Sequence, residues 1–243
     1  MKITVVAEIG SNWEGNIIKA KKIIRECKKS GADAVKFQMW RADDLYDTKH
    51  PSWKVIKKSE LTFNQASILK KFADKIKIDF FCSAFFPEAV DFLESINVKR
   101  YKIASRTCLF KDPFALETLK KKASTKKPVI ISMGMGGNKK KILKIFSKNN
   151  KTFCYCISEY PLEFEKIDWA MALQYDGFSD HTMGITAPII FTSLKKINNS
   201  KEIYIEKHVK LKNSKGPDAS TSIDTEHLSV LISRIRLIEK IKF

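Results

Sequence analysis

Residues 100–132 read RYKIASRTCLFKDPFALETLKKKASTKKPVIIS, and this stretch contains one complete unit of the fold that we predict. It begins and ends with short apolar runs, RYKIA (100–104) and PVIIS (128–132), which have the length and composition of buried strands. Between them, Pro113 opens an amphipathic segment of helical period over 113–123. A strand, a helix and a second strand in this order are typical of a parallel sheet.

The same alternation of strand and helix extends over the whole chain. Six further strands are predicted at 3–8, 34–38, 78–82, 152–156, 176–180 and 203–207. The helical patterns that follow the eight strands lie near 17–30, 62–76, 87–95, 113–123, 138–148, 166–174, 184–196 and 225–241. We therefore predict an α/β fold, a single (β/α)8 TIM barrel, with residues 1–243 as one domain. The longest connection, near 40–61, is predicted to be a loop over the mouth of the barrel.

Composition and charge exclude several classes of function. The formal net charge is +18, but only six of the 45 basic residues are Arg, and the lysines are spread over the predicted helices without a nucleic-acid motif, so we expect no nucleic-acid partner. Apolar runs reach only about ten residues, too short to cross a membrane, and residues 1–10 do not resemble a signal peptide. Five cysteines, an odd number in apolar segments, indicate reduced thiols. We expect a cytoplasmic protein with no membrane partner.

Charged and polar residues lie where the predicted strands end. Active sites of this architecture lie at the C-terminal ends of the strands, and side chains two apart on a strand point to the same side. Glu206 and His208 therefore share one face, as do Lys36 and Gln38. The other polar residues on or directly after strand ends are Glu8, Lys102, Ser132 and His181.

The two histidines favour a metal site. A single histidine at a strand end is commonly a hydrogen-bonded core residue, but His181 and His208 follow neighbouring strands and have Asp180 and Glu206 beside them. Imidazole pairs completed by carboxylate or water suit a divalent ion such as Mn²⁺ or Zn²⁺. Two nitrogen ligands would leave positions open to a substrate, as in catalytic metal sites.

Lys36 and Lys102 are both predicted to point inward at the rim. Either their stems pack while the ammonium groups reach solvent, or the ammonium groups bind an anion. Because a buried, unpaired ammonium is strongly unfavourable, we favour a phosphate or carboxylate ligand. Additional donors at the same rim are the hydroxyls of Ser83, Ser105 and Ser132 and the backbone of Gly134–Gly137, a plausible phosphate cradle.

Eight motifs in order along nearly the whole chain carry a family resemblance: AEIGSNWEG (7–15), GADAVKFQ (31–38), RYKIAS (100–105), KPVIISMGM (127–135), SEYP (158–161), SDHTMG (179–184), IEKH (205–208) and GPD (216–218). They resemble the sialic acid synthase family, which comprises N-acetylneuraminate synthase and its relatives that make legionaminic and pseudaminic acids. Members of that family condense phosphoenolpyruvate with an open-chain acetamido sugar aldehyde, release phosphate and form a 2-keto acid.

The resemblance implies a role for each polar residue at the rim. It implies catalytic roles for Glu8, Glu206 and Lys36, metal binding by His181 and His208, and substrate contacts from Gln38, Ser83, Lys102, Ser105, Ser132, Ser158, Tyr160 and Asp218. The metal, Mn²⁺ or Mg²⁺, would polarise the aldehyde. The two lysines would hold phosphoenolpyruvate, and the two glutamates would transfer protons or orient water.

The chain also departs from the family pattern. Arg106 and Thr107 follow Ser105 where the family usually has a glycine and a carboxylate, CSAF (82–85) replaces a proline-containing run, and Trp13 stands where a histidine is common. The chain is expected to end with the eighth helix, without the C-terminal antifreeze-like domain of full-length members. The alternative to an enzyme is therefore a non-catalytic or partner-dependent barrel that binds a metal and a phosphorylated sugar. The expected protein partner is a second copy of the chain or a separate antifreeze-like domain.

Overall fold

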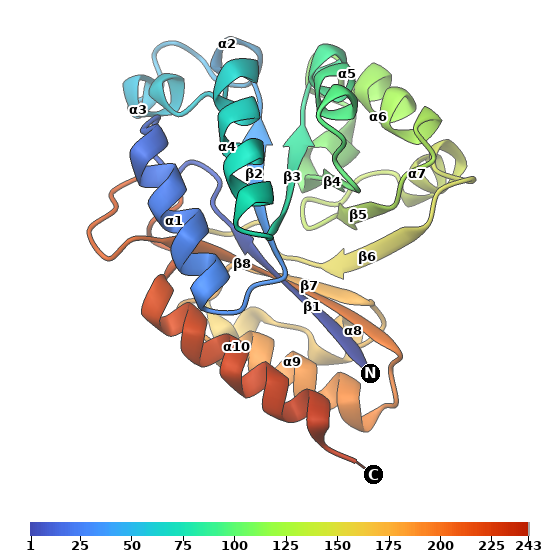
Figure 1. Cartoon of the computed structure of the whole chain (residues 1–243). Helices are drawn as coiled ribbons and strands as arrows, with labels where there is room; N and C mark the ends of the chain where they lie inside the picture. Colours follow the sequence, from blue (N-terminus) through green and yellow to red (C-terminus); the bar gives the residue numbers. More distant parts are fainter. Residues whose placement is uncertain (243) are drawn as a thin grey trace.

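The computed structural model describes residues 1–242 and contains nine parallel strands, of which the first eight close into a barrel (Figure 1). The strands are β1 (Lys2–Glu8), β2 (Ala34–Met39), β3 (Asp79–Ala84), β4 (Tyr101–Ile103), β5 (Val129–Ser132), β6 (Lys151–Tyr155), β7 (Gly177–Asp180), β8 (Glu202–Lys210) and β9 (Ile223–Asp224). Each pairs in parallel with the next, and β1 also pairs with β8, with Glu8 opposite His208. The predicted (β/α)8 TIM barrel is confirmed.

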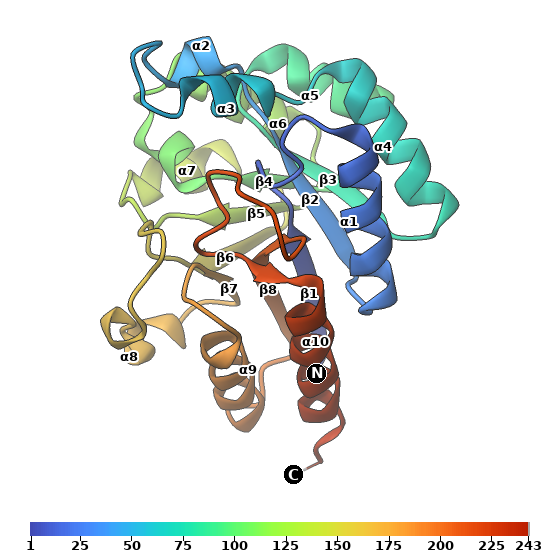
Figure 2. The ribbon, with the colours of Figure 1, turned by 90° about the vertical axis from the view of Figure 1, so that its left-hand side faces the viewer.

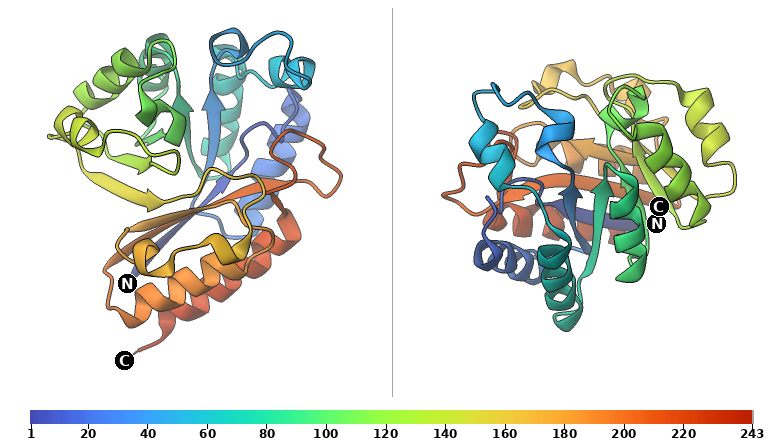
Figure 3. Two further views of the ribbon diagram at one scale, coloured as in Figure 1. Left: turned by 180° about the vertical axis from the view of Figure 1, so that it is seen from behind. Right: turned by 90° about the horizontal axis from the view of Figure 1, so that it is seen from above.

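Helices cover the outside of the strands (Figure 3). The longer ones are α1 (Ile17–Lys29), α4 (Phe63–Lys75), α5 (Pro87–Ser95), α6 (Ala115–Ser124), α9 (Thr186–Ile197) and α10 (Thr225–Lys240), and the shorter ones are α2 (Ala42–Leu45), α3 (Trp53–Lys58), α7 (Lys139–Ile145) and α8 (Trp169–Ala172). The last two long helices, α9 and α10, lie side by side (Figures 1 and 2). Within residues 1–242, none of the helices has the length and apolar character needed to cross a membrane.

Several helices begin at capping side chains, and the longer ones bury one apolar face. At the start of α1, the Asn16 side chain accepts a hydrogen bond from the Lys19 N–H. Before α4, Thr62 and Gln65 form a reciprocal capping box. The buried side chains of α1 recur at helical spacing, so they face the barrel: Ala20, Ile23, Ile24 and Cys27.

The prediction of a helix over 166–174 is wrong in its extent. A 3-10 turn occupies Phe164–Lys166, and α8 then spans only Trp169–Ala172. Asp168 caps α8 by accepting from the Met171 N–H, and the chain reaches β7 only five residues after the helix ends, so there is little room for a longer one. The predicted loop near 40–61 contains α2 and α3.

Lys122 on α6 is a charged side chain in the core of the fold. It is fully buried, and its Nζ donates to the carbonyl oxygens of Ala84 on β3 (2.7 Å) and Lys102 on β4 (3.2 Å). Burial away from water disfavours the ammonium form and lowers the pKa of Lys122 to about 7. No carboxylate forms an ion pair with it among the residues described.

This burial predicts that stability depends on pH above neutrality. The pKa of Lys122 is lower in the folded protein than in the unfolded chain, so between about pH 7 and 10.5 the unfolded chain binds more protons. The free energy of unfolding should therefore rise with pH in this range, relative to Lys122→Met, by at most about 1.4 kcal/mol per pH unit. Urea unfolding of both proteins at pH 7, 8, 9 and 10 measures the difference, and a constant difference would contradict the prediction.

Candidate active site

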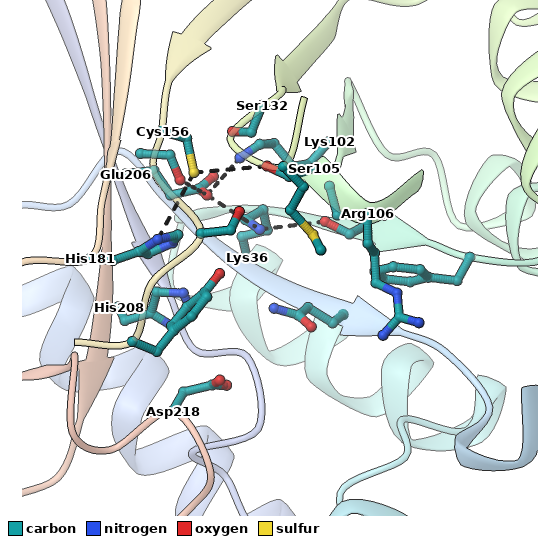
Figure 4. A pocket seen from close by; sticks show the side chains of 18 of the residues that line it. Lys36, Lys102, Ser105, Arg106, Ser132, Cys156, His181, Glu206, His208 and Asp218 are labelled. Carbon is teal, nitrogen blue, oxygen red and sulfur yellow. Dashed lines mark hydrogen bonds and ion pairs between the residues drawn. The ribbon is translucent and has the colours of Figure 1, made fainter. Parts of the chain in front are cut away.

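The C-terminal ends of the barrel strands surround a cavity of about 350 Å³ (Figure 4). The structure brings almost all of the predicted site residues to its wall: Lys36, Gln38, Ser83, Lys102, Ser105, Ser132, Ser158, Tyr160, His181, Glu206, His208 and Asp218. Glu8 lies behind this wall and contacts Lys36 and Gln38. This placement follows from the strand geometry. In a parallel barrel all strands end at the same rim, and every second residue of a strand points into the barrel.

Two lysines and two glutamates form a buried network in this cavity. Lys36 Nζ lies 2.7 Å from Glu8 Oε2 and 3.6 Å from Glu206 Oε1, and Lys102 Nζ lies 2.7 Å from Glu206 Oε1. All four side chains are almost completely buried. The lysines are thus paired with carboxylates of the same chain before any ligand enters, which the sequence did not indicate.

The two glutamates differ in their surroundings. Both oxygens of Glu206 are occupied: Oε1 accepts from Lys102 and from Ser179 Oγ (2.9 Å), and Oε2 accepts from the Tyr204 hydroxyl (2.7 Å). Burial alone would raise its pKa, but the charges of Lys102 and Lys36 and these hydrogen bonds outweigh burial and hold the pKa of Glu206 well below its usual value. Glu206 is therefore a fixed anion that orients the lysines.

Glu8 has the properties of a proton carrier. Burial raises the pKa of Glu8 to about 7, and the nearby charge of Lys36 only partly opposes this effect. Its Oε1 accepts from Gln38 Nε2 (2.8 Å). A carboxyl group that titrates near neutrality beside one that remains ionised is the arrangement found in acid–base catalysis. The structure thus separates two residues to which the sequence assigned the same role.

The two histidines lie next to each other at the rim, with ring centroids 5.5 Å apart. His181 Nδ1 lies 2.7 Å from the Ile157 carbonyl oxygen, so it is a donor and Nε2 of the neutral ring is free to bind a ligand. Burial lowers the pKa of His208 to about 3, which keeps its ring neutral, and its buried Nδ1 has no hydrogen-bond partner among residues 1–242. Burial also disfavours the charged form of His181, but the Cys156 thiol and the Ile157 carbonyl outweigh burial and raise the pKa of His181 above its ordinary value. A divalent ion binds the neutral form of imidazole, so His208 is already in that form and His181 would release its proton when an ion binds.

Protein ligands beyond these two histidines are not apparent. In the described part of the chain, no group of three or more His, Cys, Asp and Glu side chains is arranged to hold a metal ion. Asp180, which the sequence placed beside His181, instead pairs with Lys207. Water or substrate oxygens would have to complete the coordination of an ion held by His181 and His208.

The residues expected to contact the sugar are held in place by neighbours. Asp218 Oδ2 accepts from the backbone N–H (2.9 Å) and the hydroxyl (2.7 Å) of Ser11. Gly10 allows this approach, because a Cβ at that position would lie 2.5 Å from Asp218 Oδ2. Gln38 is fixed between Glu8 and Trp40 Nε1, which donates to Gln38 Oε1 (3.2 Å). The Tyr160 ring is half exposed and packs 4.1 Å from the His181 ring.

Two backbone N–H groups of the glycine-rich segment are not available to the predicted phosphate cradle. The Gly134 N–H donates to Ser105 Oγ (2.9 Å), and the Gly136 N–H donates to the Met133 carbonyl (2.9 Å). These two groups are already used within the chain. Ser132 Oγ, in contrast, is buried without a partner in the described structure and remains available to a ligand.

Arg106 lies at the cavity wall, and the adjacent Ser105 also lines the cavity. The strand β4 ends at Ile103, and Ser105–Leu109 form a 3-10 turn, so alternation with period two no longer applies. The guanidinium makes two hydrogen bonds to Asp112 (2.9 and 2.7 Å) and lies 5.5 Å from the centre of the Tyr46 ring. Thr107, where the family usually has a carboxylate, is buried.

Reasoning from the sequence also missed a set of residues that support the site. Cys156 lines the cavity, with Sγ 3.9 Å from His181 Nδ1. Tyr204 and Ser179 hold Glu206, as described above. Lys207 lies between Glu206 and His208, so alternation turns it away from the mouth, and its side chain is fully buried, with Nζ 2.6 Å from Asp180 Oδ2. Tyr204 lies two positions before Glu206 on the same strand, so both side chains point to the same side. A polar residue at this spacing from a predicted catalytic residue is the sequence signal that would have identified Tyr204.

Comparison with known proteins gives consistent matches over the same residues. A model of the NeuB family matches residues 23–242. A protein of Methanocaldococcus jannaschii is 35% identical over 97% of this chain and 71% of its own length, and the N,N'-diacetyllegionaminic acid synthase of Campylobacter jejuni is 33% identical over 98% and 77%. Human N-acetylneuraminate-9-phosphate synthase is 30% identical over 97% of this chain and 70% of its own length. The N-acetylneuraminic acid synthetase structure from Leptospira borgpetersenii has the same fold, with a TM-score of 0.87, 24% identity and coverage of 99% and 85%.

Proposed function

The chain belongs to the NeuB family, and from this premise we propose that it condenses phosphoenolpyruvate with an acetamido sugar aldehyde, giving a sialic-acid-like nonulosonic acid and phosphate. Relatives named as legionaminic, pseudaminic and N-acetylneuraminate-9-phosphate synthases support the reaction class. The observation that carries the proposal is that the lysine–glutamate network and both histidines open onto one cavity.

The phosphoenolpyruvate end of the cavity is the part around the two lysines. Lys36 and Lys102 would meet the phosphate and carboxylate groups of the substrate, and Glu206 would keep both ammonium groups in position. The Ser132 hydroxyl, which has no partner within residues 1–242, would donate to the same anion. The pKa of Glu8 is about 7, so part of the Glu8 population is protonated near neutrality. In that state only Glu206 is negatively charged, and the two lysines keep a net positive charge that can bind the anion.

The bond changes require a group that gives and takes protons. C3 of phosphoenolpyruvate bonds to the aldehyde carbon, whose oxygen must gain a proton, while water adds at C2, loses a proton and phosphate leaves. Glu8, which titrates near neutrality beside Gln38, suits the transfer to the aldehyde oxygen. A divalent ion, Mn²⁺ or Mg²⁺, held by His181 and His208 would supply Lewis acidity toward that oxygen. Gln38, Tyr160 and Asp218 line the space where the sugar chain would extend.

The experiment that tests the proposal measures phosphate release from phosphoenolpyruvate with Mn²⁺ and a panel of acetamido-hexoses and smaller aldehydes. We expect release to require both an aldehyde and the ion. In His208→Ala it should fall at least about a hundredfold, since even the partners of metal ligands contribute up to that factor. The matched control is His227→Ala, an exposed histidine on α10 that should leave the rate unchanged.

The same proteins give a readout that does not depend on activity. After loading with Mn²⁺ and gel filtration, the metal content should fall in His208→Ala and not in His227→Ala. Equal metal content and equal phosphate release in the two variants would overturn the assignment of the site. Phosphoenolpyruvate binding without phosphate release for any aldehyde would favour the non-catalytic barrel instead.

A further inference from the structure

A second cavity lies at the opposite end of the barrel, between the N-terminal ends of the strands. Its volume is about 750 Å³, compared with about 350 Å³ for the cavity at the C-terminal ends. We call it the basal cavity, and its inner wall is formed by Thr4, Ile130, Thr152 and Tyr204. The interior of a TIM barrel is usually filled by layers of bulky side chains, so a hollow of this size requires an explanation.

The basal cavity exists because the inward residues of the lowest layer are small. Thr4 on β1 and Thr152 on β6 are partly exposed to solvent although they lie in mid-sheet strands of a closed barrel. A cavity of several hundred Å³ has the size of sites for small molecules.

Charge and hydroxyl groups give this cavity a chemical preference. Its lining includes five cations and two anions: Lys2, Lys99, Arg100, Lys151, Lys201, Asp176 and Glu202. Arg100 and Lys99 share the Asp79 carboxylate (2.9 and 4.0 Å), whereas Lys2 and Lys201 make no ion pair within residues 1–242. The excess of positive charge at the rim attracts anions. The threonine hydroxyls deeper inside offer hydrogen bonds to a hydroxylated ligand.

We propose that the basal cavity binds a small hydroxylated oxyanion, that is, a sugar-like molecule with a phosphate or carboxylate group. The anionic group would lie at the rim between Lys2 and Lys201, and the hydroxyl groups would meet Thr4 and Thr152. An occupant would also contact the ring of Tyr204, whose hydroxyl donates to Glu206 Oε2 (2.7 Å). The Tyr204–Glu206 hydrogen bond therefore links a residue of the basal cavity to a residue of the cavity at the C-terminal ends.

Thiol labelling tests this site independently of catalysis and of the other cavity. Four native cysteines are completely or almost completely buried and Cys156 lines the other cavity, so the labelling of Thr152→Cys in excess of wild-type labelling reports on the basal cavity. We expect a negatively charged methanethiosulfonate to react about tenfold faster than a cationic one, after normalisation to the exposed Ser95→Cys on α5, because the cations concentrate anions locally. Thr4→Cys provides the same measurement if Thr152→Cys does not fold.

Protection by ligands identifies the class. Millimolar ribose 5-phosphate, gluconate or both should slow the labelling, whereas neutral glucose should not slow it. Protection by ribose 5-phosphate shows that phosphate is recognised, and protection by gluconate shows that carboxylate is recognised. Lys2→Ala/Lys201→Ala should weaken the protection severalfold, and Lys71→Ala/Lys144→Ala, two exposed lysines on α4 and α7, should not. Equal rates for the two reagents, protection by glucose as strong as by the anions, or no protection at all would overturn the proposal.

Discussion

Replacement of Lys102 by methionine is expected to slow phosphate release strongly and to lower the free energy of unfolding by about 3–5 kcal/mol, the usual cost of leaving a buried charge without its partner. Lys102 is the closest cation to Glu206, at 2.7 Å, and the remaining one, Lys36, lies at 3.6 Å. The loss of one donor to a developing anion would reduce the rate by a factor of about 10²–10³. Urea unfolding and a phosphate-release assay measure the two effects separately.

A double variant separates the two causes. In Lys102→Met/Glu206→Gln no carboxylate is left unpaired. The glutamine carbonyl can accept from one of the Ser179 and Tyr204 hydroxyls, and the amide N–H can donate to the oxygen of the other. Most of the stability should return, because neutral replacements of a buried pair are commonly tolerated, while phosphate release should stay as slow as in the single variant. The matched control is Lys166→Met, whose partner Glu159 is on the surface, and it should change neither quantity. A double variant as unstable as the single one would show that the cost does not come from the charge.

Periodicity and the positions of polar residues at strand ends were enough to predict the barrel and the charged residues of its rim, whereas Ser158, Tyr160 and Asp218 were predicted only from the family resemblance. Alternation with period two paired Lys36 with Gln38 and Glu206 with His208, and the structure places all four at one cavity. This works because barrel closure aligns the strand ends, as with Glu8 opposite His208. Where the strand ends early, after Ile103, the 3-10 turn brings the adjacent residues Ser105 and Arg106 to the same cavity wall, so alternation with period two no longer applies.

The pairing of charges was not predictable from one strand at a time. Lys102 on β4 meets Glu206 on β8 across the barrel, over 104 residues of sequence, and only the three-dimensional closure brings them to 2.7 Å. The different pKa values of Glu8 and Glu206 follow from that geometry. The basal cavity was not predicted for a related reason. Small inward residues leave a cavity only where barrel closure brings them together from separate strands, and the sequence of one strand does not show this.

The Lys207–Asp180 pair supplies the second large effect. Lys207 is fully buried, and its Nζ contacts Asp180 Oδ2 at 2.6 Å and also donates to the Thr182 carbonyl. Asp180 Oδ1 in turn accepts from the Thr182 N–H (2.9 Å), so the pair fixes the turn that carries His181. Lys207→Met should therefore lower the free energy of unfolding by about 3–5 kcal/mol, measured by urea unfolding.

The position of His181 gives this prediction a second readout. If the pair orients the turn, then Asp180→Asn/Lys207→Met should recover stability but still bind less Mn²⁺ than wild type, because the new amide side chain would lack the ammonium that fixes the native carboxylate. Lys210→Met is the matched control on the same strand, since Lys210 donates only to the Ala219 carbonyl (2.7 Å) and makes no ion pair in the described chain. Full recovery of both stability and metal content in the double variant would mean that the buried pair stabilises the fold without orienting His181.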